Sequence, residues 1–302
     1  MRFDCFGSRC GVWAAIPEAE EDARRCMENW HVRFSRFLGD SELSRLNGDP
    51  REVVPVSTSM ARLVETVREA AEATDGLVDG TLLGEIEAAG YVSDLPAPLP
   101  LRLALRLGGP RAPAAPNPHS RWRELEVAGW EVRRPPGVRL DSGGLAKGLF
   151  ADLLAERLQD HRSFAVDCGG DLRFTGPLRR LEVADPFGGK PVHVFELETA
   201  SVATSGVGRR SWLGPDGRPA HHLLDPATGR PAFTGVVQAT ALAPTAVEAE
   251  WRAKAAVLSG PDGAARWLEH GGVVVLDDGT HFVTEPPTTS LRGGQHHEPA
   301  RL

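Results

Sequence analysis

Five short segments of the chain combine glycine with charged or hydroxyl residues, a pattern that can hold an anionic ligand. They read TDGLVDGT (74–81), DSGGLAKG (141–148), DCGGDLR (167–173), ATSG (203–206) and HHLLDPATGRP (221–231). Glycine-rich backbone at the start of a helix offers free N–H groups and the positive end of the helix dipole, and both favour phosphate. Lys147 adds a positive charge, and hydroxyl donors come from Ser142, Thr204 and Ser205. Together the segments predict an enzyme or binder of a phosphorylated small molecule.

Each segment, taken alone, also has an ordinary structural explanation. TDG is common in turns, GGLAKG can simply begin a helix, and GGD can form a bulge at the end of a strand. DPATG carries the Asp, Pro and Gly signals of a type I turn, and His221 and His222 can simply flank that turn. The phosphate interpretation therefore depends on the five segments acting together.

A further stretch, AVEAEWRAKAAVLSG (246–260), is predicted to form an amphipathic helix that carries two opposite charges. Glu250 and Lys254 lie one helical turn apart, beside a row of apolar side chains. Thr245 and Glu248 have the spacing of a capping box, so we expect the helix to begin near them. The pair is either an ordinary salt bridge on a solvated face or two charges placed for chemistry.

The rest of the pattern predicts the elements that must position these segments. Residues 2–14 read as a strand, and the acidic run after Pro17 opens a helix. Ser57 or Ser59 is expected to cap a second helix, which Gly76 ends. The following elements are a hairpin at 122–140, strands at 163–174 and 192–204, a last helix at 262–270, and closing strands around VVVL and HFVT.

Strands and helices do not alternate regularly along the chain, so a doubly wound sheet is not expected. The pattern favours an α+β layered fold, built as a single domain over residues 1–285. Within it, residues 92–118 are rich in Pro, Ala and Arg and are predicted to form a loop. Residues 286–302 are polar and are predicted to be a disordered tail.

The composition is that of a globular protein and argues against several kinds of partner. Of 302 residues, 41% are hydrophobic and 25% are charged, and the net charge of −7 disfavours a nucleic-acid partner. No stretch reaches about eighteen apolar residues, so no membrane segment is expected. No signal peptide is recognised, which favours a cytoplasmic location. Four cysteines are expected to be reduced and mostly buried: Cys5, Cys10, Cys26 and Cys168.

The order of the motifs resembles the FAD:protein FMN transferase family, also called ApbE-like proteins, over residues 3–284. The blocks that carry the resemblance are FGSRCGV, RFSRFLGDSELSRLN, TDGLVDGTLLGEIEAAGY, LDSGGLAKG, DCGGD, SVATSG and HHLLDPATGRP. Within these blocks, four positions depart from the family pattern, with Phe6 for Met, Ser8 for Thr, Gly80 for Pro and Asp167 for Asn. No single motif is specific, but their common order is.

The resemblance implies an ApbE-like fold with mixed or antiparallel sheets and packed helices. It also implies cleavage of the FAD pyrophosphate, attachment of FMN to a Thr or Ser hydroxyl of an acceptor protein, and release of AMP. By resemblance His222 is the general base, since the pKa of histidine lies near neutrality. His221 is then structural, and Asp225 either orients His222 or caps the turn. The implied FAD-binding residues are Ser8, Ser41, Asn47, Asp79, Thr81, Lys147, Gly169, Gly170, Asp171, Thr204, Ser205, Gly206 and Asp225.

The family uses a divalent metal, normally Mg²⁺, which prefers oxygen ligands. The resemblance implies that these ligands are the Ala146 carbonyl and an Asp and a Thr on a late helix. The chain departs at both side chains. Glu250 stands at the Asp position and keeps a carboxylate, whereas Lys254 stands at the Thr position and supplies a cation with no acceptor.

Three interpretations of this departure stay open. In the first, Glu250 and Ala146 still hold Mg²⁺, Lys254 contacts the pyrophosphate, and transfer with His222 and Lys254 as catalytic residues survives. In the second, the Lys254 ammonium replaces the metal, and the protein is a slow transferase or an FAD-binding homologue. In the third, the pair is an ordinary salt bridge in a degenerate site. A hydrolase that splits FAD into FMN and AMP is a further alternative, and the sequence names no acceptor protein.

Overall fold

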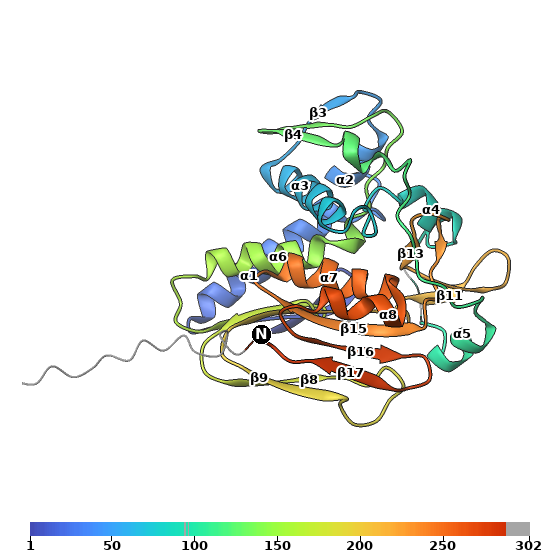
Figure 1. Cartoon of the computed structure of the whole chain (residues 1–302). Helices are drawn as coiled ribbons and strands as arrows, with labels where there is room; N and C mark the ends of the chain where they lie inside the picture. Colours follow the sequence, from blue (N-terminus) through green and yellow to red (C-terminus); the bar gives the residue numbers. More distant parts are fainter. Residues whose placement is uncertain (94, 96, 288–302) are drawn as a thin grey trace, which may run out of the picture.

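The computed structural model describes residues 1–93, 95 and 97–287, and its centre is a large antiparallel sheet (Figure 1). Among the described residues, neighbouring strands of this sheet follow the order β1 (Arg2–Cys5), β2 (Ser8–Ala14), β6 (Phe164–Cys168), β7 (Leu172–Thr175), β10 (Ala200–Gly206), β15 (Val236–Ala243), β16 (Gly272–Leu276) and β17 (His281–Thr284). Every neighbouring pair in it is antiparallel. The predicted α+β class with antiparallel sheets is confirmed.

Helices lie over one face of this sheet, and a small sheet formed by residues 53–55 and 126–133 lies beyond these helices, away from the large sheet (Figure 1). The helices are α1 (Pro17–Phe34), α2 (Glu42–Gly48), α3 (Thr58–Ala73), α4 (Leu83–Ala88), α5 (Leu101–Leu107), α6 (Ala146–Arg157), α7 (Ala246–Leu258) and α8 (Gly260–Ala264). The small sheets pair β3 (Val53–Pro55) and β4 (Glu126–Ala128) with β5 (Glu131–Arg133), β8 (Arg179–Val183) with β9 (His193–Leu197), β11 (Ser211–Leu213) with β12 (Pro219–His221), and β13 (Leu224–Asp225) with β14 (Arg230–Pro231).

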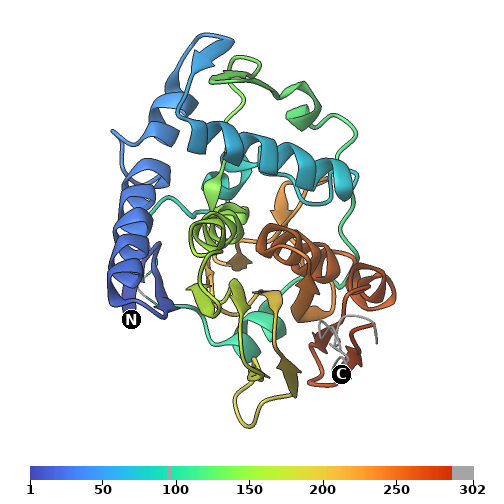
Figure 2. The ribbon, with the colours of Figure 1, turned by 90° about the vertical axis from the view of Figure 1, so that its left-hand side faces the viewer.

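The helices α6 and α7 lie side by side on the sheet, and Figure 2 shows them nearly along their axes, with α3 packed across them. The start of α7 is fixed twice. The Thr245 hydroxyl accepts the N–H of Glu248 at 3.1 Å, which confirms the predicted cap. From α6, the Asp152 carboxylate accepts the N–H groups of Ala246 at 2.9 Å and of Val247 at 3.0 Å. These bonds set where α7 begins relative to α6.

The core between the sheet and the helices is aromatic at the end near the N-terminal hairpin. The Phe150 ring stacks on Phe6 and on Trp30 with 4.9 Å between centroids in each case. Cys10 on β2 lies opposite Cys168 on β6, and both are buried free thiols. The prediction of mostly buried cysteines is confirmed for these positions.

The N-terminal segment differs from its prediction. Residues 2–14 are not one strand but the β1–β2 hairpin, because the chain reverses at Phe6 and Gly7, whose φ angles are 54° and 62°. The predicted strands at 163–174 and 192–204 likewise each divide into two. The alternation of apolar and polar residues does not by itself reveal where the chain reverses direction in a tight turn.

Two further segments differ from their predictions. The stretch 92–118, predicted as a loop, contains α5, where Leu101 and Leu105 lie one turn apart and pack against the core. The last helix, expected at 262–270, begins at Gly260 as α8 and continues as a 3-10 turn to Trp267. Of the predicted tail, the part from residue 288 onward lies outside the described residues.

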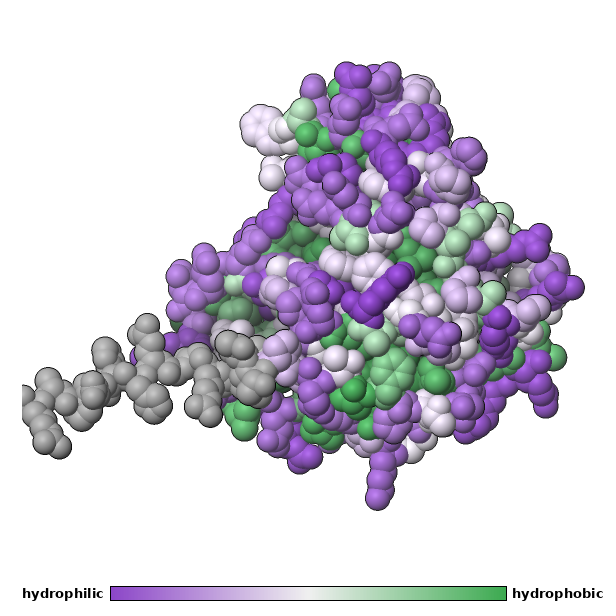
Figure 3. Space-filling model, viewed as in Figure 1, coloured by the Kyte–Doolittle hydropathy of each residue, from purple (hydrophilic) through white to green (hydrophobic). Residues whose placement is uncertain are grey.

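The face seen in Figure 3 is mainly hydrophilic in its upper part, and its hydrophobic residues gather in the lower half. In the described ranges, no helix combines the length and apolar character needed to cross a bilayer.

Candidate functional site

The predicted segments meet at one cavity of about 840 Å³. They reach it from β2, the loop before α4, the N-terminus of α6, the turn between β6 and β7, β10, the loop after β12, and α7. The predicted site residues that line the cavity are Ser8, Asp79, Ala146, Lys147, Gly169, Gly170, Thr204, Ser205, Gly206, His222 and Lys254. The fold therefore collects residues that lie far apart in the sequence.

Several other predicted site residues do not line the cavity and instead stabilise the local structure around it. The Ser41 hydroxyl caps the first turn of α2. The Asn47 amide bonds both backbone groups of Leu140, at 2.7 Å to its N–H and 2.9 Å to its carbonyl. The Thr81 hydroxyl donates to the Asp79 carboxylate at 2.6 Å. These contacts fix the loops on which the lining residues lie.

Asp225 also lies outside the lining, at the end of β13 where the turn to β14 begins. Its carboxylate accepts the N–H of Ala115 at 2.9 Å, the N–H of Ala227 at 3.2 Å and the hydroxyl of Thr228 at 2.8 Å. These are the contacts of a turn cap, one of the two roles that the sequence left open. The bond to Ala115 also ties the 92–118 segment to this turn.

A group of four charged residues, here called the inner charge cluster, lies between α6, α7 and the β6–β7 turn: Lys147, Asp171, Glu250 and Lys254. The Lys254 ammonium donates to Glu250 Oε1 at 2.9 Å, and the Lys147 ammonium lies 3.6 Å from the same oxygen. Lys147 also bonds the Asp171 carboxylate. Glu250 is completely buried, and two positive and two negative groups balance.

Burial and neighbouring charges compete within the inner charge cluster. Burial raises the pKa of the Asp171 carboxyl to about 6, with Glu250 adding to the effect. Burial also lowers the pKa of the Lys254 ammonium, although Glu250 opposes it. For Lys147 and Glu250 the opposite charges outweigh burial, so the pKa of Lys147 is raised and that of Glu250 is lowered. Glu250 is therefore held as a carboxylate between two ammonium groups.

The close approach of α6 and α7 depends on Gly148. A Cβ atom at this position would lie 2.8 Å from the Ala246 carbonyl oxygen and 2.9 Å from Glu250 Oε2. Because glycine leaves this space open, its own N–H donates to Glu250 Oε2 at 2.9 Å. Both carboxylate oxygens of Glu250 are thus occupied by donors from α6 and α7.

These atoms do not fit a divalent cation. Mg²⁺ requires oxygen ligands at close range, but Glu250 Oε2 accepts a backbone N–H and Oε1 faces two ammonium groups. Lys254 offers donors only. A divalent cation at Glu250 would lie against the positively charged ammonium groups of Lys147 and Lys254.

His222 lines the cavity, and its neighbour His221 lies in the core. In the described chain, Nδ1 of His222 and Nε2 of His221 have no hydrogen-bond partner. Although part of the His222 ring faces the cavity, burial, with help from Arg210, lowers its pKa well below the usual value. Burial lowers the pKa of His221 to about 3, and its ring packs edge-on against Phe233. His222 is thus the accessible neutral base of the two.

The structure adds three arginines that the sequence reasoning missed. Arg209 and Arg210 line the cavity and follow the ATSG segment after two intervening residues, so a paired cation near a Gly-containing motif is the signal that could have found them. Arg36 lines it too, with its guanidinium 4.3 Å from the Phe37 ring centroid and 4.6 Å from that of Tyr91. Arginine and aromatic side chains therefore line the same cavity as the glycine-rich segments, and Arg209 donates to the Gly169 carbonyl at 3.4 Å.

Comparison with known proteins agrees with this geometry. The model of the ApbE family matches residues 6–276. The chain belongs to the ApbE family. The "FAD:protein FMN transferase" of Treponema pallidum is 29% identical, with 89% of this chain and 80% of that protein covered. The one of Rhodobacter capsulatus is 27% identical over 95% of this chain, which spans only 57% of that protein. The crystal structure of an ApbE protein from Thermotoga maritima superposes with a TM-score of 0.76 at 26% identity, covering 97% of this chain and 98% of that one.

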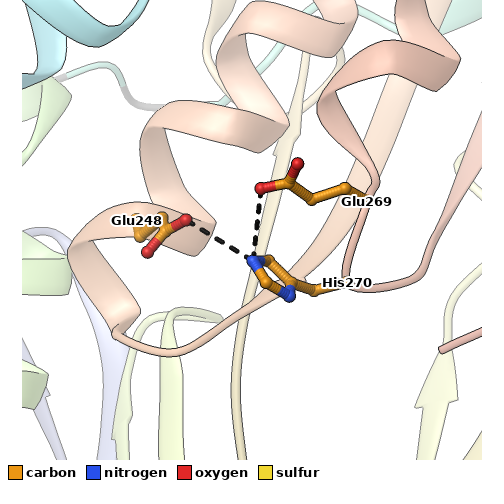
Figure 4. Close-up of side chains that lie close together, drawn as sticks. All are labelled: Glu248, Glu269 and His270. Atoms are coloured by element: carbon orange, nitrogen blue, oxygen red, sulfur yellow. Dashed lines mark ion pairs between the residues drawn. The ribbon is translucent and has the colours of Figure 1, made fainter. Parts of the chain in front are cut away.

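This ApbE-family chain carries a second group of charges on the outer side of α7, here called the outer charge cluster: Glu248, Arg252, Glu269 and His270. Figure 4 shows the His270 ring pointing at both carboxylates, with Nε2 at 3.7 Å from Glu248 and 3.3 Å from Glu269. Arg252 already bonds both glutamates. Within the described residues, Glu248, Glu269 and His270 are the only three acidic or imidazole ligands that converge, and Arg252 explains their grouping as ion pairs.

Proposed function

We propose that the protein transfers FMN from FAD to the hydroxyl of a Thr or Ser residue in an acceptor protein and releases AMP. The observation that carries this proposal is that the Gly-rich and charged segments, separate in the sequence, line one cavity. Membership of the ApbE family and relatives named FAD:protein FMN transferase support the activity.

The cavity has the size and the chemistry that FAD requires. Its 840 Å³ is within the range of about 300–1,000 Å³ typical of ligand pockets. Phe37 and Tyr91 offer aromatic surface to a flat ring system. Gly169 and Gly170, both with positive φ, let the ligand approach the backbone. Arg209 and Lys254 supply positive charge for the diphosphate.

The reaction balances without a further reactant. The acceptor hydroxyl oxygen bonds to the FMN phosphorus, and the anhydride bond to AMP breaks with its electron pair on the AMP phosphate. His222 accepts the hydroxyl proton, because its lowered pKa keeps the imidazole neutral at neutral pH. Lys254 at the cavity wall neutralises charge that develops on the leaving phosphate.

The test incubates the protein with FAD and a flavin-acceptor domain and follows the acceptor by mass spectrometry. We expect the acceptor to gain the mass of FMN less one water, with one AMP released. His222→Gln should slow transfer by about 10²–10⁴-fold because the base is lost, while FAD binding is retained. His270→Gln, in the outer charge cluster, should transfer at the wild-type rate.

Other products would contradict the proposal in distinguishable ways. FMN and AMP formed from FAD without a change in acceptor mass would identify a hydrolase. FAD bound without any product would identify an FAD-binding homologue. Replacing the acceptor Thr or Ser by Ala should abolish the mass gain, since no hydroxyl remains to attack.

We also propose the cytoplasm as the site of action. The four cysteines are free thiols, and Cys5, Cys10 and Cys168 are buried. Free thiols suit the reducing cytosol, where disulfides are rare. Cell fractionation followed by immunoblotting tests this location, and recovery outside the cytosolic fraction would contradict it.

A further inference from the structure

The inner charge cluster reaches the cavity through its two lysines. Lys147 and Lys254 both line the cavity. Each ammonium is held by a buried carboxylate, Lys147 by Asp171 and Lys254 by Glu250. The carboxylates are almost completely buried, with exposed fractions of 1% and 0%. The acids therefore stand behind the lysines and present the ammonium groups to the cavity.

We propose that the ammonium groups of Lys147 and Lys254 take the place of a divalent cation at the diphosphate, so that this site binds and uses FAD without metal. The proposal rests on the proposed function for the identity of the ligand. It extends that function by naming the groups that replace Mg²⁺.

Three features of the cluster carry the inference. First, an ammonium has three donors, and the bond to Glu250 uses one of those of Lys254. Second, the fixed carboxylates orient both ammonium groups before the ligand arrives, which is the preorganisation that stabilises developing charge. Third, two positive and two negative groups already balance, so no further cation is needed to make the buried cluster neutral.

The geometry at Glu250 also disfavours the alternative of a bound metal. Its Oε2 accepts the Gly148 N–H at 2.9 Å, and its Oε1 accepts from Lys254 at 2.9 Å. A metal would have to displace both donors and then remain beside the Lys147 ammonium, 3.6 Å from Oε1. Charge replacement by lysine requires none of these changes.

The test measures the dissociation constant of FAD by isothermal titration calorimetry, in EDTA and in excess Mg²⁺. We expect wild-type values that differ by less than about twofold. Glu250→Asp together with Lys254→Thr restores short oxygen ligands near the Ala146 carbonyl, and this variant should bind FAD at least about tenfold more tightly with Mg²⁺ than in EDTA.

The same exchange on the outer charge cluster, Glu248→Asp together with Arg252→Thr, is the matched control and should bind FAD equally in both buffers. Wild-type binding that requires Mg²⁺ would overturn the inference. So would a double variant at Glu250 and Lys254 that remains indifferent to Mg²⁺.

A parallel assay of FMN transfer separates this inference from the proposed function. Transfer in EDTA at the rate seen with Mg²⁺ supports both. Transfer that occurs only with Mg²⁺ overturns the inference and keeps the function. Metal-independent FAD binding without transfer in either buffer overturns the proposed function and keeps only the metal-free FAD binding that the inference predicts.

Discussion

Helix α7 carries two acid–base pairs of the same spacing, and their surroundings differ. Glu250 and Lys254 face α6 and the cavity, where the glutamate has no exposed surface. Glu248 and Arg252, two residues earlier, face Glu269, whose side chain is 57% exposed. Spacing of four residues allows an ion pair in both cases, but the glutamate is buried only in the inner pair, where its side chain is 1% exposed against 24% for Glu248.

The surroundings of a charged pair on a helix, and not the spacing of its two residues, determine the role of the pair. The outer pair is partly open to water at Glu248, whose side chain is 24% exposed, while Arg252 is 10% exposed and keeps a second partner in Glu269. A helix pair that water can reach contributes about 0.2–0.5 kcal/mol, because water solvates the partners when they separate. A buried charge that loses its partner has no such alternative. The inner pair is therefore expected to be sensitive to substitution and the outer pair tolerant.

The largest effect is expected from Glu250→Gln. This change removes the carboxylate between the Lys147 and Lys254 ammonium groups and leaves like charges in a buried site. We expect the free energy of unfolding to fall by about 3–5 kcal/mol, measured by urea denaturation. A loss below 1 kcal/mol would show that the buried cluster is not electrostatically coupled.

A second substitution tests the helix contact that holds the inner charge cluster. Gly148→Ala places a methyl group 2.8 Å from the Ala246 carbonyl oxygen, so α6 and α7 must separate. We expect a loss of about 1–3 kcal/mol in the free energy of unfolding. Gly144→Ala, one turn earlier, is the control, because its Cβ would meet nothing within 4 Å. Equal stability of the two variants would contradict the packing argument.

A third test uses pH and the buried His221. Its pKa is about 3 in the folded protein against 6.5 for the ordinary group. Below pH 6.5 this histidine is protonated in the unfolded chain but stays neutral in the folded protein. The free energy of unfolding therefore falls by about 1.4 kcal/mol per pH unit until about pH 3.

Urea denaturation of wild type and His221→Gln at neutral and mildly acidic pH checks this expectation. The variant should lose stability less steeply as the pH falls, because the buried imidazole is gone. The same slope in both proteins would place the source of acid sensitivity elsewhere.

The smallest effect is expected in the outer charge cluster. Glu248→Gln removes one of two glutamates that contact Arg252, and Glu269 remains. We expect the free energy of unfolding to change by no more than about 0.5 kcal/mol. A loss comparable to that of Glu250→Gln would remove the distinction between the two faces of α7.

Local signals predicted much of the fold. Thr245 and Ser57 cap their helices as expected, with the Ser57 hydroxyl accepting the Met60 N–H at 3.2 Å. The reversal at Phe6 escaped prediction, because a non-glycine residue with positive φ has a weak sequence signature. The helix α5 escaped because a Pro- and Ala-rich composition outweighed the apolar spacing within it.

The site was predictable only as far as its motifs extend. The resemblance placed Lys147 and His222 at the ligand, and both line the cavity. The bond from Lys147 to Asp171 and the approach of Lys147 to Glu250 were not predictable, because they depend on how closely α6 and α7 pack. The sequence showed that Glu250 and Lys254 depart from the family pattern. Only the structure showed which charged groups surround them.

The most direct measurement of the difference between the two faces is the FAD dissociation constant in EDTA for Lys254→Met and Arg252→Met. Each change removes one cation from α7, the first from the cavity and the second from the outer charge cluster. Loss of a charged hydrogen bond should weaken FAD binding by about 10–100-fold in Lys254→Met, while Arg252→Met should bind as the wild type does. Equal affinities of the two variants would contradict the role of the inner pair at the diphosphate.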